Sequence, residues 1–180
     1  ARAQGIDVTI DQYPYTRCST SVRASLPPWV QEGGVAKICE RLRDPETRGK
    51  VGAEIEHSMD LSQECNWESM LRHSGGPVGA LIVYSPLTPE WEGKNLQEIA
   101  EMEGTTPIEA AFDLIVANKG NDLACYDAIS DDDVKSIIRH PATMIGSDSI
   151  PAAKGAKAHP RSYGTHTRVL AQYVREEKVL

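Results

Sequence analysis

The chain has 180 residues, with 19 Lys and Arg against 26 Asp and Glu, a formal net charge of −7. Its 40% apolar and 25% charged residues are typical of a globular domain, which excludes disorder over the whole chain. The acidic balance argues against a nucleic-acid binder, and no apolar run approaches the ~20 residues that span a bilayer. We therefore expect neither nucleic acid nor membrane as a partner.

The cysteines favour a reducing compartment. The four of them show no C-x-x-C spacing and lie at Cys18, Cys39, Cys65 and Cys125. Their low density argues against a disulfide scaffold and against a zinc knuckle. Residues 1–5 are followed by no apolar signal region, so we expect a cytoplasmic protein. Because the chain also lacks a start Met, we expect it to be a processed or excised piece.

Alternating short strands and helices are predicted over the first half. Gly5 ends a helical segment, and Val8–Ile10 is predicted as a strand, followed by a polar loop rich in Ser and Thr. Asp44 before Pro45 is typical of a helix start. Ala80–Tyr84 has the composition of a buried strand, after a polar loop. A helix before Asp44 is predicted by apolar residues at i, i+3, i+4 and i+7, which are Val35, Ile38, Cys39 and Leu42.

The second half continues the alternation with clearer helix starts. Asn95 with Glu98 is the pattern of a capping box, and Thr106-Pro107 begins another helix. A strand over 123–128, a helix opening at Ser130, a strand over 143–145 and a final helix after Arg161 follow. The final helix is predicted to bury one stripe, formed by Val169, Leu170, Tyr173 and Val174.

This alternation predicts an α/β fold. Two strands whose ends carry polar side chains, near Tyr13 and near Asp148, are separated by far more residues than a βα connection needs. The intervening segment has strands and helices of its own. It is therefore predicted to be an insertion domain.

Three side chains are candidates for chemistry. Asp148 follows an apolar strand, where α/β enzymes hold catalytic groups, and could act as general base and then as acid. A turn aspartate that accepts a backbone hydrogen bond is the alternative. The planar fork of Arg161 suits a carboxylate, although most loop arginines are solvated charges. Tyr13 could donate a phenolic hydrogen bond to the same ligand, or could simply pack at the strand end.

No complete metal site is visible in the sequence. The histidines form no H-x-H or H-E-x-x-H pair, and His159 and His166 flank a turn without a known metal spacing. We expect most of them to be solvent-facing or structural. A phosphate-binding glycine loop and a G-x-S-x-G nucleophile motif are also absent from the sequence.

Three ordered motifs together resemble the D-aminoacylase (N-acyl-D-amino-acid deacylase) family of the amidohydrolase superfamily. They are Gly5-Ile6-Asp7-Val8-Thr9-Ile10-Asp11-Gln12-Tyr13-Pro14-Tyr15, then Met144-Ile145-Gly146-Ser147-Asp148, then His159-Pro160-Arg161-Ser162-Tyr163-Gly164-Thr165 with Arg168-Val169-Leu170. The middle of the chain is less similar, although Pro28-Trp29, Glu32-Gly33-Gly34 and residues 41–45 resemble the longer members of the family. The similarity covers both ends of the chain closely.

The resemblance implies a (β/α)₈ barrel that hydrolyses N-acyl-D-amino acids with zinc. Residues 1–15 and 132–180 would supply the last two barrel strands and a final helix, and residues 16–131 a mixed α/β insertion or lid domain. Asp148 matches the aspartate that activates the zinc-bound water, with a weak role as metal ligand. Arg161 matches the arginine that binds the substrate carboxylate, while Tyr13 and Ser147 would contact the substrate.

The departures from the family predict a fragment. The histidine and cysteine zinc ligands of the family come from earlier strands, so zinc would be bound mainly outside this chain. The usual Gly-Ser-Asp-Gly reads Gly-Ser-Asp-Ser here, because Ser149 replaces the last glycine. We expect the chain alone to be inactive, and its open strand edges to cause self-association.

Two other functions remain open. The chain could be an autonomous, non-catalytic lid or binding module that folds without zinc. Alternatively, the barrel could act on a cyclic amide such as a hydantoin. Arg161 argues mildly against the cyclic amide, because such a substrate need not carry a carboxylate.

Overall fold

The computed structural model describes residues 2–149, 157 and 159–180. The chain divides into two compact units, one formed by Ala1–Thr16 with Ile129–Leu180 (unit 1) and the other by Arg17–Ala128 (unit 2). These boundaries lie within three residues of the predicted insertion, 16–131. The assignment of the units to a barrel and a lid stays a prediction.

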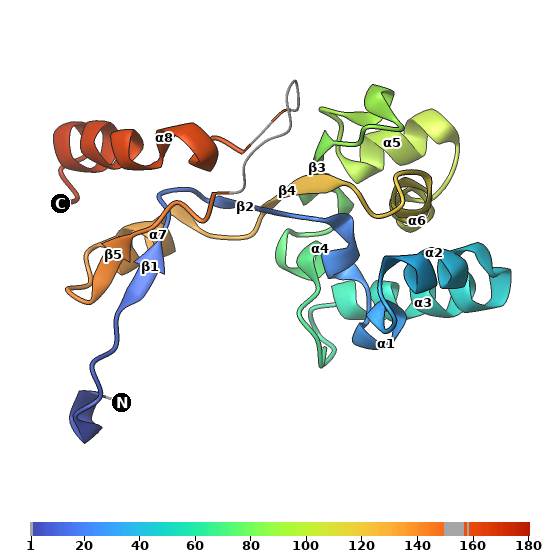
Figure 1. Cartoon of the computed structure of the whole chain (residues 1–180), viewed down its shortest axis with the longest axis horizontal. Coiled ribbons are helices and arrows are strands. Elements are labelled where there is room, and N and C mark those ends of the chain that lie inside the picture. Colours follow the sequence, from blue (N-terminus) through green and yellow to red (C-terminus); the bar gives the residue numbers. More distant parts are fainter. Residues whose placement is uncertain (1, 150–156, 158) are drawn as a thin grey trace. The chain divides into compact units, whose positions relative to one another are not determined.

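The described residues of unit 1 form two parallel strands. β1 (Ile10–Gln12) pairs with β5 (Thr143–Ile145), with Ile10 opposite Thr143, and the two strands lie side by side in Figure 1. The helical segments are a 3₁₀ turn at Arg2–Gln4, α7 (Asp131–Ile138), α8 (Arg161–Arg168) and a π-helix at Val169–Glu176 that continues α8. A small buried cluster of Val134, Ile138 and Tyr173 forms the core.

Unit 2 contains an antiparallel sheet and the larger core. Its strand order is β2 (Arg17–Thr20), β4 (Leu123–Asp127), β3 (Ala80–Tyr84). The helices are α1 (Pro28–Gln31), α2 (Val35–Arg43), α3 (Pro45–Met59), α4 (Met70–His73), α5 (Leu96–Glu103) and α6 (Pro107–Ala117), with 3₁₀ turns at Val22–Ser25, Pro77–Gly79 and Pro89–Trp91. One continuous apolar cluster, which includes Ile82, Phe112 and Tyr126, joins the sheet to these helices.

The predicted helix starts are confirmed by their capping bonds. The Asp44 carboxylate accepts the Thr47 N–H at 2.9 Å at the start of α3. Asn95 and Glu98 form both bonds of a capping box, and the Thr106 hydroxyl accepts the Glu109 N–H at 3.2 Å. These bonds satisfy backbone donors that have no partner within the helix, which fixes where each helix begins.

Three local predictions are wrong. The first strand spans Ile10–Gln12, two residues later than predicted. Residues 17–20, predicted as loop, form β2 because β4 supplies antiparallel backbone partners that a local pattern does not reveal. In the final helix Val169 and Tyr173 are buried, but Leu170 is 64% exposed and Val174 41%. The small core of unit 1 covers only part of the predicted stripe.

No helix among the residues that the structure describes combines the length and the apolar character needed to cross a membrane.

Candidate functional site

Parallel pairing of β1 and β5 brings the segments that follow them, which carry predicted site residues, to the same end of the small sheet in unit 1. Tyr13 directly follows β1, and Gly146-Ser147-Asp148 directly follows β5. The Gly146 N–H donates to the Gln12 carbonyl at 3.2 Å, which continues the ladder past the last paired residues. A Cβ at Gly146 would lie 3.1 Å from the Asp11 Cβ, so a glycine here lets the two strand ends approach closely.

Asp148 and Arg161 form an ion pair at this end of the sheet. Arg161 Nη1 lies 2.8 Å from Asp148 Oδ2, and the side chains are 5% and 70% exposed. Asp148 has a φ of +46°, the left-handed region, which aspartate tolerates better than most residues. The pair therefore joins a buried cation to a carboxylate that remains open to solvent.

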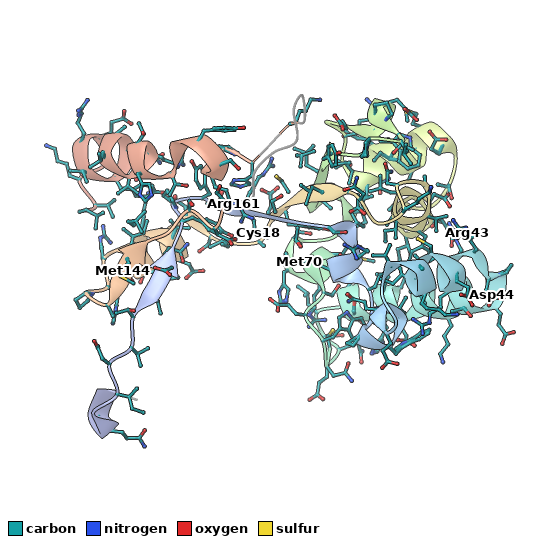
Figure 2. All side chains as sticks on the ribbon, viewed as in Figure 1. Cys18, Arg43, Asp44, Met70, Met144 and Arg161 are labelled. Atoms are coloured by element: carbon teal, nitrogen blue, oxygen red, sulfur yellow. The ribbon has the colours of Figure 1, made fainter. Side chains whose placement is uncertain are left out.

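Several contacts fix the position of Arg161. Its guanidinium carbon lies 5.3 Å from the Tyr13 ring centroid, within the range of a cation–π contact. Its backbone N–H donates to His159 Nδ1 at 3.0 Å, and its carbonyl accepts the Thr165 hydroxyl at 3.0 Å. Arg161 begins α8, and it is labelled in Figure 2. Its backbone is thus held from both sides at the first turn of a helix.

An aromatic cluster holds the segment after β1 against α8. The Tyr15 and His159 rings meet edge to face with centroids 5.0 Å apart, and Tyr13 lies 6.4 Å from each of them. Arg168 donates to the Pro14 carbonyl at 2.7 Å, and its guanidinium carbon lies 5.1 Å from the Tyr15 ring centroid. The sequence prediction missed Tyr15, His159 and Arg168 as parts of this site, although all three lie inside the motifs that carry the resemblance.

Ser147 lies between Gly146 and Asp148 and is half-buried. Its assignment to substrate binding stays a prediction. Ser149, where the resemblance implies a glycine, is exposed. The unusual backbone angle lies at Asp148, one residue before it.

The described residues do not assemble a metal site. Across 2–149, 157 and 159–180, no three His, Cys, Asp or Glu side chains come together in a group that could hold a metal ion. Asp148 could offer one carboxylate, but its visible partner is the cation of Arg161. The residues described therefore do not fit a complete zinc centre.

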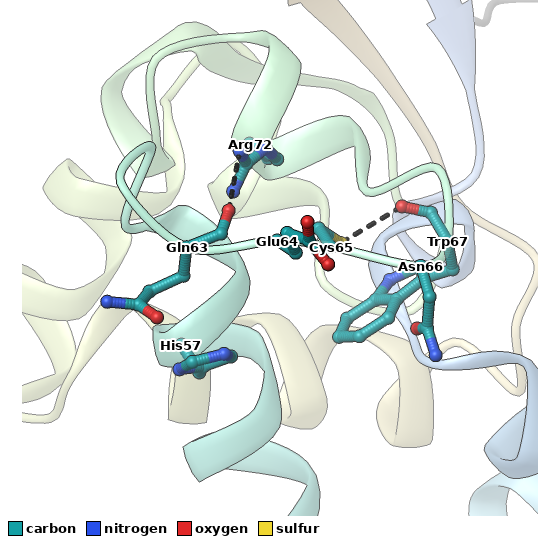
Figure 3. Close-up of a pocket in the computed structure, with 7 residues that line it drawn as sticks. All are labelled: His57, Gln63, Glu64, Cys65, Asn66, Trp67 and Arg72. Carbon is teal, nitrogen blue, oxygen red and sulfur yellow. Dashed lines mark hydrogen bonds between the residues drawn. The ribbon is translucent and has the colours of Figure 1, made fainter.

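A hollow lies in unit 2 (Figure 3). His57 of α3 and the loop residues that follow it face this hollow, whose lining consists of His57, Gln63, Glu64, Cys65, Asn66, Trp67 and Arg72. Arg72 donates to the carbonyls of Ser58, Asp60 and Gln63, which fixes the shape of the loop. None of the predicted site residues is among these lining residues.

Comparison with known proteins gives a consistent set of relatives. No protein-family model matches the chain. Over 99 residues it is 39% identical to N-acyl-D-glutamate deacylase of Alcaligenes xylosoxydans xylosoxydans, which covers 55% of this chain and 19% of that protein. Over 96 residues it is 33% identical to D-aminoacylase of the same organism, covering 53% and 18%.

Solved structures give the same result over nearly the whole chain. N-acyl-D-glutamate deacylase from Bordetella bronchiseptica, complexed with zinc and a phosphonate inhibitor, matches with a TM-score of 0.62 and 28% identity. A D-aminoacylase described as defining a novel subset of amidohydrolases matches with a TM-score of 0.58 and 25% identity. Both matches cover 99% of this chain and 26% of the solved chain.

The resemblance to the D-aminoacylase family is confirmed. These two solved structures also support the predicted α/β fold of an amidohydrolase. The chain spans about a quarter of the length of the solved D-aminoacylase relatives, and 18–19% of the curated ones.

Proposed function

We propose that the chain forms part of a zinc-dependent hydrolase that cleaves the amide bond of N-acyl-D-amino acids. The names of the relatives support this class of substrate. The observation that carries the proposal is the 2.8 Å pair between exposed Asp148, which follows β5, and buried Arg161, which packs on Tyr13 after β1. This pair combines a group that binds carboxylates with a group that can exchange protons.

In this proposal Arg161 binds the α-carboxylate of the substrate. Its side chain is only 5% exposed, so water screens its charge weakly and a charge-assisted hydrogen bond there is strong. The Tyr13 ring packs against the guanidinium, which limits the directions from which a carboxylate can approach. Tyr13 and Ser147 would complete the contacts with the substrate.

Asp148 acts as the acid and base. Its carboxylate takes a proton from a water as the water oxygen bonds to the acyl carbon. The carbon–nitrogen bond then breaks, and the same proton passes to the nitrogen that leaves as the amine. Its 70% exposure leaves the carboxylate accessible to a water molecule.

Zinc enters the proposal through the resemblance and through the zinc complex of a relative. A bound zinc ion supplies a more acidic water and a polarised carbonyl. Its main ligands would come from outside this chain, with Asp148 as a weak ligand at most. We accordingly propose that the isolated chain is inactive.

A non-catalytic module is the second candidate. Unit 2 is compact, and its core is larger than that of unit 1. A module of this kind would unfold cooperatively without zinc, at a temperature that zinc does not change.

Amine release tests the proposal. The full-length protein that carries these residues, with added zinc, should release amine from N-acetyl-D-amino acids and not from their L enantiomers. Asp148→Asn should abolish the release, whereas substitution of the exposed Asp132 should not. Equal rates for both enantiomers, or full activity in Asp148→Asn, would contradict the assignment. Chelator-sensitive turnover by the 180-residue chain would show that it closes a metal site by itself.

A further inference from the structure

The ring of His159 has a specific geometric relation to Arg161. It is 6% exposed, and its Nδ1 accepts the backbone N–H of Arg161 at 3.0 Å. That N–H is one of the donors at the start of α8 that have no partner within the helix. Pro160, which immediately precedes Arg161, makes no side-chain capping bond. The imidazole therefore caps the helix that carries Arg161.

The same ring is held by its neighbours. Tyr15, 8% exposed, meets it edge to face at 5.0 Å, and Tyr13 lies 6.4 Å away. Tyr13 is also the ring on which the Arg161 guanidinium packs. His159 thus contacts both the backbone of Arg161 and the aromatic group that flanks its side chain.

We propose that His159 is a positioning residue for Arg161, whose guanidinium it fixes for a ligand carboxylate through the Nδ1 acceptor, while the Tyr15 contact holds the imidazole ring. This proposal rests on the proposed function for the identity of the ligand, an α-carboxylate. The positioning itself rests on the contacts within unit 1. His159 touches no reacting atom in this proposal, so it should affect carboxylate binding more than the chemical step.

Two substitutions separate the acceptor from the ring. His159→Asn keeps an acceptor oxygen close to the position of Nδ1 and removes the ring. His159→Phe keeps a planar ring against Tyr15 and removes the acceptor. His166→Phe, at an exposed position on α8, is the matched control.

Hydrogen exchange of the Arg161 amide in the 180-residue chain tests how His159 positions Arg161, and it does not require enzymatic activity. We expect His159→Phe to speed this exchange about 5- to 10-fold, the effect of one lost hydrogen bond, and His159→Asn to retain protection. His166→Phe should leave the Arg161 amide unchanged. Unchanged protection in His159→Phe would overturn the proposal.

Kinetics of the full-length protein test the consequence for binding. In His159→Phe we expect KM for an N-acetyl-D-amino acid to rise about 5- to 10-fold with kcat within about twofold, and His159→Asn to restore KM. If folded His159→Asn shows the same KM as His159→Phe, the acceptor does not position Arg161 and the proposal fails. A wild-type protein that releases no amine would contradict the proposed function, while the exchange measurement would still decide the role of His159.

Discussion

At the residue scale, substitution of Arg161 is expected to weaken binding of the substrate carboxylate specifically. Arg161→Ala in the full-length protein should raise KM for N-acyl-D-amino acids by about 10- to 100-fold, the loss of a charge-assisted pair at a buried site. Arg161→Lys keeps the charge without the fork and should give a smaller increase. Steady-state kinetics measure both, and unchanged KM in Arg161→Ala would remove Arg161 from the site.

Asp148 is expected to have two separable roles. Asp148→Asn should abolish turnover, because the amide cannot take up the proton of the attacking water. The affinity of the same variant for the substrate carboxylate should stay the same or increase, because the negative charge 2.8 Å from Arg161 Nη1 is gone. Calorimetric titration with an N-acetyl-D-amino acid measures the second effect. Loss of both binding and turnover in a folded variant would show that Asp148 mainly positions Arg161.

Burial of the Asp122 carboxyl makes the stability of unit 2 depend on pH. Its Oδ2 accepts the Val22 N–H at 2.6 Å and the Ser21 hydroxyl at 3.0 Å, but burial still raises the pKa of this carboxyl above its ordinary value. The native state therefore holds the Asp122 proton more tightly than the unfolded chain does. This contribution to stability is complete at a pH below the unfolded pKa of about 4, and it is lost as pH rises through the native value.

Asp122→Asn removes that dependence and keeps an acceptor oxygen. The free energy of unfolding of the variant minus that of the wild type should therefore increase as pH rises from about 4 to 7. Urea unfolding at a series of pH values measures it, with the exposed Asp132→Asn as control. A difference that stays constant with pH would contradict the role of burial.

Individual residues show how far sequence alone leads to the site. Asp148, Arg161 and Tyr13 could be proposed because each lies beside a strand end or in a motif, and the structure brings the three together. The contacts of His159, Tyr15 and Arg168 could not be predicted. They depend on the packing of α8 against the segment that follows β1. The spacing of residues along the chain gives no sign of this long-range contact.

At the scale of elements, the ends of helices were easier to predict than the strands. Capping residues act within three positions of one another, so Asp44, Asn95 and Thr106 mark helix starts directly in the sequence. β2 was missed because Arg17–Thr20 acquires its order from β4, which lies about a hundred residues later. Helix caps can be read from the sequence because they involve neighbouring residues. The pairing of strands that are far apart in the sequence cannot be read in this way.

The cap of α6 provides a test at this scale. Thr106→Ala removes the hydroxyl that accepts the Glu109 N–H and should lower the free energy of unfolding by about 1 kcal/mol. The neighbouring exposed Thr105→Ala is the matched control and should change stability much less. Thermal and urea unfolding followed by circular dichroism compare the two, and equal effects would show that the cap contributes nothing specific.

At the scale of the whole molecule, the small sheet of unit 1 is expected to drive self-association. β1 and β5 form a sheet of only two strands among the described residues, and each strand exposes an apolar side chain, Ile10 at 42% and Met144 at 50%. Met144 is labelled in Figure 2. Since Ile10 pairs with Thr143 and Met144 with Asp11, the two exposed side chains lie on opposite faces. Open edges and apolar faces of this kind favour pairing with another copy.

Light scattering after size exclusion measures this association. The molar mass of the chain should rise with concentration, and Ile10→Lys with Met144→Lys should reduce the rise. Leu61→Lys in unit 2, where the leucine is 74% exposed, is the control and should not reduce it. A constant monomer mass at high concentration would contradict the expectation.

The most direct test of the central claim is an NMR titration of the 180-residue chain, labelled with ¹⁵N in its arginine side chains. N-acetyl-D-alanine carries the α-carboxylate as its only charge, and N-acetyl-D-alaninamide carries none. We predict that the acid produces a saturable shift of the Arg161 Nε resonance and that the amide produces none. Equal shifts with both compounds, or a shift confined to other arginines, would contradict the assignment of Arg161 as the carboxylate-binding group.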